Sequence, residues 1–256
     1  MINDSMKQKS WQVLTKVPRL TIYFWIIKLL TTAMGEATSD LLVYKISPYI
    51  AVAVGFIILV VALIIQFAAK KYEPWKYWLA ALAVSIAGTM GADVMHVGLG
   101  VPYIASTIFY LIVLGLILFI WYKSEHTLSI HSIYTKKRET FYWATVLATF
   151  ALGTAAGDLT AYTFKLGFLL SAGIFIFIFI IPCILYWRLH FNPIFTFWFA
   201  YIFTRPIGAS FADWFSKPVS VGGLGLGDLS VSVVLFVLII ILVAYSTINR
   251  VDSYTQ

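Results

Sequence analysis

One pattern of three residues recurs four times along the chain without a change of register. In each copy a tryptophan that follows Phe or Tyr precedes a glycine by ten residues and an aspartate by fifteen. The tryptophans are Trp25, Trp78, Trp143 and Trp198, the glycines are Gly35, Gly88, Gly153 and Gly208, and the aspartates are Asp40, Asp93, Asp158 and Asp213. A fixed register of this kind indicates an internal repeat. We expect a single membrane domain over 1–256, with four repeats at approximately 18–70, 71–123, 136–190 and 191–250.

The composition indicates a membrane protein. Hydrophobic residues make up 61% of the 256 residues and charged residues only 11%, far from the usage of soluble domains. Eight apolar stretches have about the ~20 residues that cross a bilayer as a helix. They cover 20–44, 49–69, 77–97, 103–122, 141–163, 168–187, 194–215 and 229–248. These stretches predict an all-α integral membrane protein with eight transmembrane helices, built as four parallel tandem helical-hairpin repeats around a pseudo-symmetry axis.

The basic residues indicate how the chain is oriented. Most Lys and Arg residues fall in the N-terminal arm, in the C-terminal tail, or in the loops after the second, fourth and sixth stretches. The positive-inside rule then places both termini in the cytoplasm. The net charge of +7 follows from this distribution, so it requires no nucleic acid partner. We expect a multi-pass protein of the cell membrane whose surroundings are the lipid bilayer.

The positions seven, eleven and fifteen residues after each tryptophan share one face of a helix, because successive residues are rotated by ~100°. The four faces carry Thr32, Glu36 and Asp40; Ser85, Thr89 and Asp93; Phe150, Thr154 and Asp158; and Arg205, Ala209 and Asp213. A small residue also follows each repeat glycine by four positions, a pattern that lets helices approach closely in lipid. We therefore expect the four faces to surround a common interior that carboxylates and hydroxyls line.

The two-span unit in four copies, with a tryptophan in each, resembles a bacterial family of polytopic membrane proteins built from four tandem repeats of unknown function. The resemblance extends over nearly the whole chain. It implies the same four-copy membrane architecture and no particular substrate.

The carboxylates on these faces need compensation, because an acidic group in hydrocarbon costs at least ~2.5 kcal/mol. The intramembrane acids Glu36, Asp40, Asp93, Asp158 and Asp213 outnumber the intramembrane bases Lys28 and Arg205. Protons or a cation from solution must therefore neutralise the excess. Oxygen ligands of this kind suit a hard divalent ion such as Mn²⁺. His96, three residues after Asp93, would add a nitrogen ligand, or it is an ordinary histidine near the membrane interface.

These features predict a secondary transporter, or a channel-like carrier, for a small cation, and no enzyme. We expect a divalent metal such as Mn²⁺ as the bound cation, with coupling to protons and no covalent cofactor. The expected metal ligands are Glu36, Asp40, Asp93, His96, Asp158 and Asp213. The expected substrate pathway includes Lys28, Thr32, Ser85, Thr89, Thr154 and Arg205. Assembly into a homo-oligomer stays open.

Several alternatives remain at this stage. The repeat aspartates could instead end their helices at the headgroup level and cap the turns. Arg205, before Pro206, could serve as a gate at a helix kink or could form a structural salt bridge. The residues from Gly225 to Asp228 resemble the glycine-x-glycine-aspartate string of intramembrane aspartyl proteases, with Asp213 as the second carboxylate. The simpler interpretation of that string is a flexible loop with Asp228 as a helix N-cap.

Two further hypotheses concern the ligand. The protein could be a membrane sensor that binds a ligand and moves none. An anionic substrate held by Lys28 and Arg205 is the second alternative, although the surrounding carboxylates oppose it.

Overall fold

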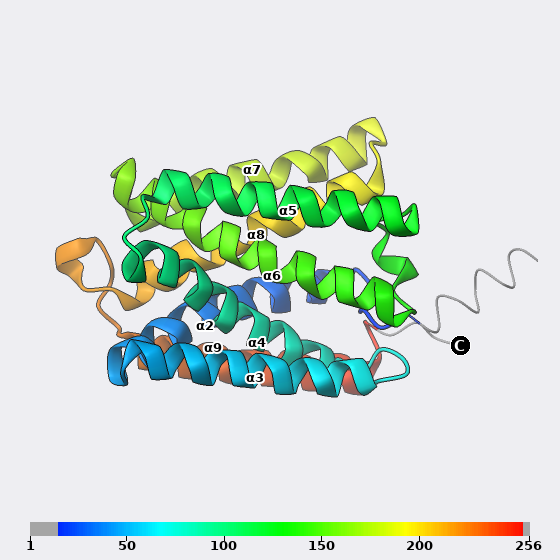
Figure 1. Ribbon diagram of the computed structural model, residues 1–256, viewed down its shortest axis with the longest axis horizontal. Coiled ribbons are helices and arrows are strands. Elements are labelled where there is room, and N and C mark those ends of the chain that lie inside the picture. The colour runs from blue at the N-terminus through cyan, green and yellow to red at the C-terminus, as the bar shows by residue number, and fades with distance from the viewer. Residues whose placement is uncertain (1–14, 253–256) are drawn as a thin grey trace, which may run out of the picture.

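The computed structural model describes residues 15–252, and this range contains helices and loops but no strand (Figure 1). The eight long helices are α2 (Ile22–Lys45), α3 (Pro48–Ala68), α4 (Pro74–Asp93), α5 (Tyr103–Glu125), α6 (Lys136–Asp158), α7 (Gly167–Leu189), α8 (Pro193–Ser216) and α9 (Asp228–Asn249). Short π-helical segments extend two of them, η1 (Val94–Gly98) after α4 and η3 (Leu159–Thr163) after α6. The short 3₁₀ segments η2 (Ile130–Ser132) and η4 (Val219–Val221) lie in loops. The prediction of an all-α protein is confirmed, with one helix for each apolar stretch.

Six of these helices are long and apolar enough to cross a membrane, namely α3, α4 with η1, α5, α6 with η3, α7 and α9. The other two, α2 and α8, are each 24 residues long. They are less apolar because they carry the charged residues on which the functional hypothesis depends, among them Glu36 and Arg205. Both of these side chains are buried inside the protein.

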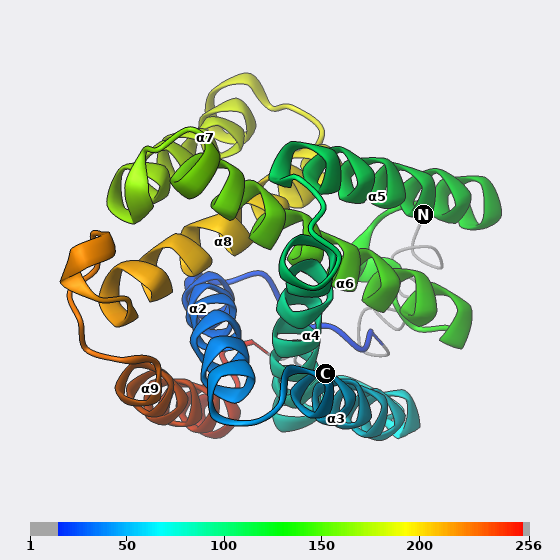
Figure 2. The ribbon, with the colours of Figure 1, turned by 60° about the vertical axis from the view of Figure 1, so that its left-hand side comes forward.

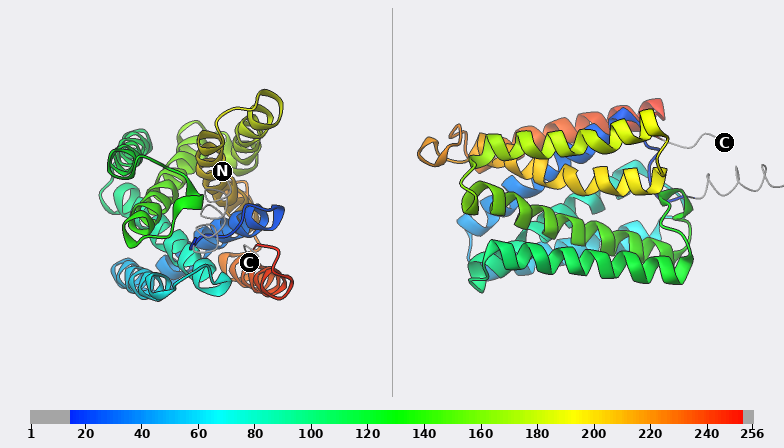
Figure 3. Two further views of the ribbon diagram at one scale, coloured as in Figure 1. Left: turned by 90° about the vertical axis from the view of Figure 1, so that its right-hand side faces the viewer. Right: turned by 90° about the horizontal axis from the view of Figure 1, so that it is seen from above.

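The four helices that carry the repeat motif form an inner ring. The helix α2 packs against α4, α4 against α6, α6 against α8, and α8 against α2, which closes the ring. In the most apolar part of α4 and of α6, 67% of the residues are buried, against 17–28% in the four helices α3, α5, α7 and α9. The latter therefore form an outer layer around the ring (Figure 3, left). Their exposed residues are mostly large and apolar, as contact with lipid requires.

Each outer helix packs mainly on the inner helix of the next repeat rather than on its own. The main partners are α3 with α4, α5 with α6, α7 with α8, and α9 with α2 (Figure 2). The two helices of one repeat follow one another along the chain, but they are not each other's principal neighbours. The four copies are consequently interleaved, and the last outer helix covers the first inner helix.

The repeat glycines allow the inner helices to touch. A Cβ atom added at any of them would collide with the residue seven positions after the tryptophan of the next copy. The pairs are Gly35 with Ser85, Gly88 with Phe150, Gly153 with Arg205, and Gly208 with Thr32. The last pair joins the fourth copy to the first, so the same contact recurs at all four junctions of the ring. The sequence prediction that these glycines provide close helix packing is confirmed.

Replacing Gly208 by alanine tests this packing. A Cβ there would lie 2.8 Å from the Cβ of Thr32 and 2.9 Å from the backbone nitrogen of Ala33, so α8 must move away from α2. We expect Gly208→Ala to lower the free energy of unfolding by about 1–3 kcal/mol, measured on the purified protein in detergent. The matched control is Gly173→Ala in α7, where an added Cβ meets no atom within 4 Å. Equal stability of the two variants would contradict the packing described here.

The loops divide between the two ends of the bundle (Figure 1). We define the basic end as the one with residues 15–20, the loops 69–73, 126–135 and 190–192, and residues 250–252. The opposite end has the loops 46–47, 99–102, 164–166 and 217–227. We call it the acidic end because the repeat aspartates lie near it, in the last turns of the inner helices. At the basic end the backbone nitrogen of Lys16 donates to the Ile133 carbonyl (2.8 Å), and that of Arg19 donates to the Asp252 carbonyl (2.8 Å). The first bond holds the segment before α2 against the loop 126–135, and the second joins the two terminal segments to each other.

A buried polar cluster reinforces the basic end. The Lys16 Nζ lies 2.6 Å from Glu139 Oε2, with 7% and 0% of the two side chains exposed. Gln66 Nε2 donates to Glu139 Oε1 (3.0 Å), and Lys16 Nζ also donates to the Phe67 carbonyl (3.2 Å). Residue 16 therefore docks on α3 and α6 through a desolvated ion pair. The sequence analysis placed Lys16 only among the positive charges of the N-terminal arm.

Candidate functional site

The interior of the ring consists of layers, each supplied by equivalent positions of the four repeats. Aromatic side chains fill the layers nearest the basic end. The residues that precede the tryptophans are buried there together with three of the tryptophans themselves: Phe24, Tyr77, Tyr142, Phe197, Trp78, Trp143 and Trp198. The hydroxyl groups of Tyr77 and Tyr142 are hydrogen-bonded to each other. These layers separate the rest of the interior from the basic end.

Lys28 and Arg205 lie in the next part of the interior and are almost fully buried, with 1% and 0% of their surfaces exposed. The Nζ of Lys28 lies 3.8 Å from the centre of the Phe150 ring and 4.3 Å from that of Tyr201. The guanidinium carbon of Arg205 lies 5.7 Å from the centre of the same Phe150 ring. The two cationic groups thus share one aromatic neighbour.

Arg205 joins all four inner helices. Its Nη2 forms an ion pair with Glu36 Oε2 of α2 and donates hydrogen bonds to Thr89 Oγ1 of α4 and to Thr154 Oγ1 of α6, the latter at 2.7 Å. The helix α8 runs through Pro206 as one helix from Pro193 to Ser216. Of the two interpretations of Arg205 from sequence, the structural salt bridge is the one that the structure contains.

The hydroxyls of Thr32 and Ser85 bond to backbone carbonyls. Thr32 Oγ1 donates to Leu29 (2.6 Å) and lies 3.2 Å from the Thr204 carbonyl, and Ser85 Oγ donates to Thr31 (2.9 Å). Both side chains were expected to line the substrate pathway. In the structure they connect neighbouring inner helices just beside the repeat glycines.

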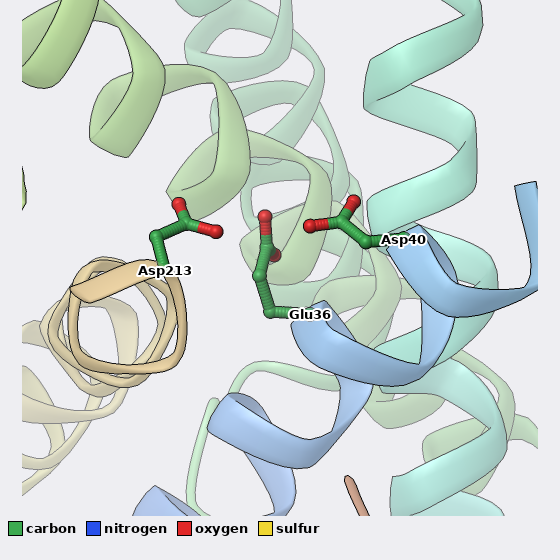
Figure 4. Close-up of side chains that lie close together, drawn as sticks. All are labelled: Glu36, Asp40 and Asp213. Atoms are coloured by element: carbon green, nitrogen blue, oxygen red, sulfur yellow. The ribbon is translucent and has the colours of Figure 1, made fainter. Parts of the chain in front are cut away.

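Three carboxylates converge between Arg205 and the acidic end. Glu36, Asp40 and Asp213 each offer an oxygen, and these oxygens lie within 4.8 Å of one another. Figure 4 shows the carboxylates of Asp40 and Asp213 on either side of that of Glu36. Glu36 and Asp213 are 5% and 6% exposed, and Asp213 Oδ1 is buried without a hydrogen-bond donor among the described residues. We call these three residues the carboxylate trio. Its oxygen donors and spacing suit a hard divalent cation.

Lys217 is the counter-ion that the sequence analysis missed. Its Nζ forms an ion pair with Asp40 and lies 3.8 Å from Asp213 Oδ1 and 3.7 Å from Asp228 Oδ1. Burial alone would lower the pKa of Lys217, but the charges of Asp40 and Asp213 outweigh it, and the pKa is raised above its usual value. Lys217 is therefore a permanent positive charge beside the trio. The sequence placed it in a loop, where its position in space could not be foreseen.

A folded loop holds Lys217 in place. The backbone nitrogens of Leu224, Gly225, Leu226 and Gly227 donate to the carbonyls of Trp214, Lys217, Phe215 and Ser216, at 2.7–3.1 Å. These bonds satisfy the carbonyls that the end of α8 leaves without partners. A Cβ at Gly223 would collide with the Lys217 backbone, so only glycine fits there. The expected loop is present, but the prediction of Asp228 as the helix N-cap is wrong. Asp228 is the first residue of α9, and Gly227 is the N-cap.

The structure leaves Asp93 and Asp158 outside the trio. Both are half-buried, and no residue within 15–252 forms an ion pair with either. Their helices continue directly into η1 and η3, and neither side chain makes a capping hydrogen bond. The capping role considered from sequence is thus absent at these two positions. Two of the four repeat aspartates, Asp40 and Asp213, meet Glu36.

His96 also lies apart from the trio. It is 8% exposed in η1, its Nδ1 is 3.0 Å from Ser106 Oγ of α5, and its ring centre is 4.6 Å from that of Tyr103. Among the described residues, the trio is the only group of three or more His, Cys, Asp or Glu side chains that lie close enough to hold an ion together. The structure therefore fits the alternative of a histidine that packs near the end of its span.

Family comparison supports the repeat architecture. The family described as a Repeat of Unknown Function (DUF347) matches four segments of the chain, residues 23–72, 76–127, 141–191 and 196–251. The chain belongs to this family. The resemblance inferred from the tryptophan register is confirmed, and the matched segments begin and end close to the repeats expected from the sequence. Comparison with curated proteins and with solved structures gives no match.

Proposed function

We propose that this protein is a secondary transporter of a small cation, with a divalent metal ion such as Mn²⁺ as the favoured substrate and coupling to protons. In this proposal all eight helices cross the cell membrane, both termini are cytoplasmic, and the inner helices are related by a pseudo-symmetry axis. The acidic end then faces outward. The recurrence of one glycine contact at all four junctions of the ring supports such an axis.

The observation that carries the proposal is the carboxylate trio inside a membrane bundle. Buried carboxylates are costly in a membrane and commonly mark ion pathways. Six acids lie in the outer half of the interior or at its mouth: Glu36, Asp40, Asp93, Asp158, Asp213 and Asp228. Among the described residues, the bases that are not exposed and lie near these acids are Lys28, Arg205 and Lys217, while Lys45 and Lys165 are exposed at the acidic end. Negative charge thus remains in excess after internal pairing, as a cation site requires.

The position of the trio favours a carrier over an open pore. Arg205, Lys28 and the aromatic layers lie between the trio and the basic end. A cation that enters from the acidic end meets Asp40 and Asp213 first and must compete with Lys217 for them. It cannot proceed past a fixed guanidinium without a rearrangement of the Arg205–Glu36 pair. Such a rearrangement would alternate access between the two ends.

The aspartyl protease hypothesis has less support. A protease of this type needs two carboxylates that share a proton. The ammonium of Lys217 lies within 4 Å of Asp213 Oδ1 and of Asp228 Oδ1, so each carboxylate faces a basic side chain that such a proton-sharing pair does not require. A sensor that binds a cation without transporting it would use the same carboxylate trio. Only a measurement of flux distinguishes such a sensor from a transporter.

The test is a flux screen in proteoliposomes with Mn²⁺, Mg²⁺, Ca²⁺, Zn²⁺, K⁺ and Na⁺ outside and a pH-sensitive dye inside. We expect flux of one divalent ion, and at least a tenfold loss in Asp40→Asn and in Asp213→Asn, because each removes an anionic ligand. We expect a smaller loss of flux in Asp93→Asn, because Asp93 lies outside the trio. Glu125→Gln at the basic end is the control and should transport normally.

Two results would contradict the proposal. Binding of a cation without flux would identify a sensor, and flux that is unchanged in both trio variants would remove the trio from the pathway. Peptide cleavage that disappears in Asp228→Asn would favour the protease.

A further inference from the structure

Lys217 holds its ammonium group where a cation bound by the trio would lie. The Nζ forms an ion pair with Asp40 and lies 3.8 Å from Asp213 Oδ1, so two of the three carboxylates share it. A metal ion coordinated by oxygens of both residues needs contacts of about 2.0–2.6 Å. The ammonium and such an ion cannot occupy this space together. Cation binding therefore requires that the Lys217 side chain leaves Asp40.

The backbone of Lys217 is fixed, whereas its side chain has room to move. The residue is the C-cap of α8, and its backbone nitrogen donates to the Asp213 carbonyl (2.8 Å). Its own carbonyl accepts from the backbone nitrogen of Gly225 (2.8 Å). The side chain is 23% exposed, and its four-carbon stem is flexible. The ammonium is thus a cation on a short tether beside the trio.

Asp228 offers this ammonium a second partner outside the trio. Its Oδ1 lies 3.7 Å from the Lys217 Nζ, and it is buried without a hydrogen-bond donor among the described residues. A shift of the ammonium by about 1 Å toward Asp228 would form a charge-assisted hydrogen bond of ~2.8 Å. The ammonium would then stay paired with a carboxylate after it leaves Asp40.

The charge balance favours replacement of the ammonium by a divalent ion over replacement by a monovalent ion. Arg205 pairs with Glu36, which leaves the formal negative charges of Asp40 and Asp213 within the trio. The ammonium neutralises one of these two charges, and a divalent ion neutralises both. Na⁺ or K⁺ brings no more charge than the group that it must displace. A tethered group also competes at a high local concentration, so a monovalent ion from solution gains nothing over Lys217.

We propose that Lys217 determines the specificity of the trio for divalent cations: its ammonium excludes monovalent ions from Asp40 and Asp213, and it moves to Asp228 when a divalent ion binds. The exchange moves a charged side chain and makes or breaks no covalent bond. This inference rests on the proposed cation transport. Because it concerns binding and selectivity, it can be tested without a measurement of flux.

The first test measures Mn²⁺ binding by calorimetry to the purified proteins, once in NaCl and once in the chloride of a large organic cation at the same ionic strength. In wild type and in Lys217→Arg, which keeps the charge, we expect the same Mn²⁺ affinity in both salts. Lys45→Met removes an exposed lysine at the same end and should behave as wild type does.

In Lys217→Met we expect Mn²⁺ to bind at least tenfold more tightly than in wild type when only the organic cation is present. NaCl should abolish this gain, because Na⁺ then enters the trio. An Mn²⁺ affinity of Lys217→Met that equals that of wild type in both salts would overturn the proposal. A Lys217→Met protein that folds only in the presence of Mn²⁺ would support it, since the ion then replaces the missing ammonium.

The second test removes the carboxylate that receives the ammonium. Asp228→Asn keeps the trio and Lys217 but leaves the displaced ammonium without a partner, so we expect Mn²⁺ binding at least tenfold weaker than in wild type. In the Lys217→Met background the same substitution should have a smaller effect, because no ammonium has to move. Equal effects in both backgrounds would overturn the proposal, since Asp228 would then act only through its own charge.

The outcomes also separate this inference from the proposed function. Binding with the expected pattern but without flux in proteoliposomes would identify a sensor and leave the specificity role of Lys217 intact. Flux of a divalent ion, with Na⁺ excluded equally by wild type and by Lys217→Met, would overturn the role of Lys217 and leave the transport function. If neither protein binds a cation, both proposals fail.

Discussion

Loss of the guanidinium in Arg205→Met lowers the free energy of unfolding by about 3–5 kcal/mol, as is typical when one partner of a buried ion pair is removed. Glu36 would lose its ion-pair partner in a dry interior, and Thr89 and Thr154 would lose their common donor. Methionine retains much of the volume, so lost packing contributes little. Unfolding of the detergent-solubilised protein, followed by tryptophan fluorescence, measures the effect.

A double-mutant cycle shows whether the charge itself causes the loss. In Arg205→Met/Glu36→Met neither charge remains, and buried ion pairs replaced by apolar residues often regain stability. We expect the double variant to be more stable than the sum of the two single variants predicts, by more than about 2 kcal/mol. Lys76→Met breaks a half-exposed pair with Glu73 and should cost less than about 1 kcal/mol. Additive single effects at Arg205 and Glu36 would refute a coupled pair.

The second large effect concerns the basic end. Glu139→Gln leaves the Lys16 ammonium buried without its carboxylate, and we expect a loss of about 3 kcal/mol in the free energy of unfolding. Lys16 is the residue that docks the segment before α2, so amide exchange at residues 15–19 should also become faster. Hydrogen–deuterium exchange with mass spectrometry measures this directly. Glu73→Gln at the same end should leave both quantities nearly unchanged, and faster exchange in that variant would argue against a specific role of Glu139.

The repeat register predicted much of the fold. The spacing from Trp to Gly to Asp placed the inner helices, their small-residue contacts and the face that carries Glu36 and Arg205. It did so because a 3.6-residue period fixes which positions share a helix side. The interleaving of the copies was not predictable in this way. The helix α3 is apolar on nearly all sides, so periodicity does not show whether α2 or α4 covers it.

The site was predictable where it follows the repeat and unpredictable where it departs from it. Asp40 and Asp213 form the trio together with Glu36, and only the first repeat has an acid at that position. Lys217 and the glycine loop have no equivalent in the other copies. Their contacts depend on a loop that folds back on the end of α8, and neither hydropathy nor spacing describes such a fold. Asp93 and Asp158 follow the repeat pattern yet lie outside the trio, and His96, which has no equivalent in the other copies, lies outside it too.

The packing of α9 on α2 also constrains biogenesis. A ribosome delivers the first inner helix long before the helix that covers it, and α2 carries Lys28, Glu36 and Asp40 into the membrane. Glu36 and Asp40 gain their partners Arg205 and Lys217 only when α8 and the loop after it have been made. The outer side of α2 is covered only when α9 follows, so the bundle can close only when synthesis is nearly complete.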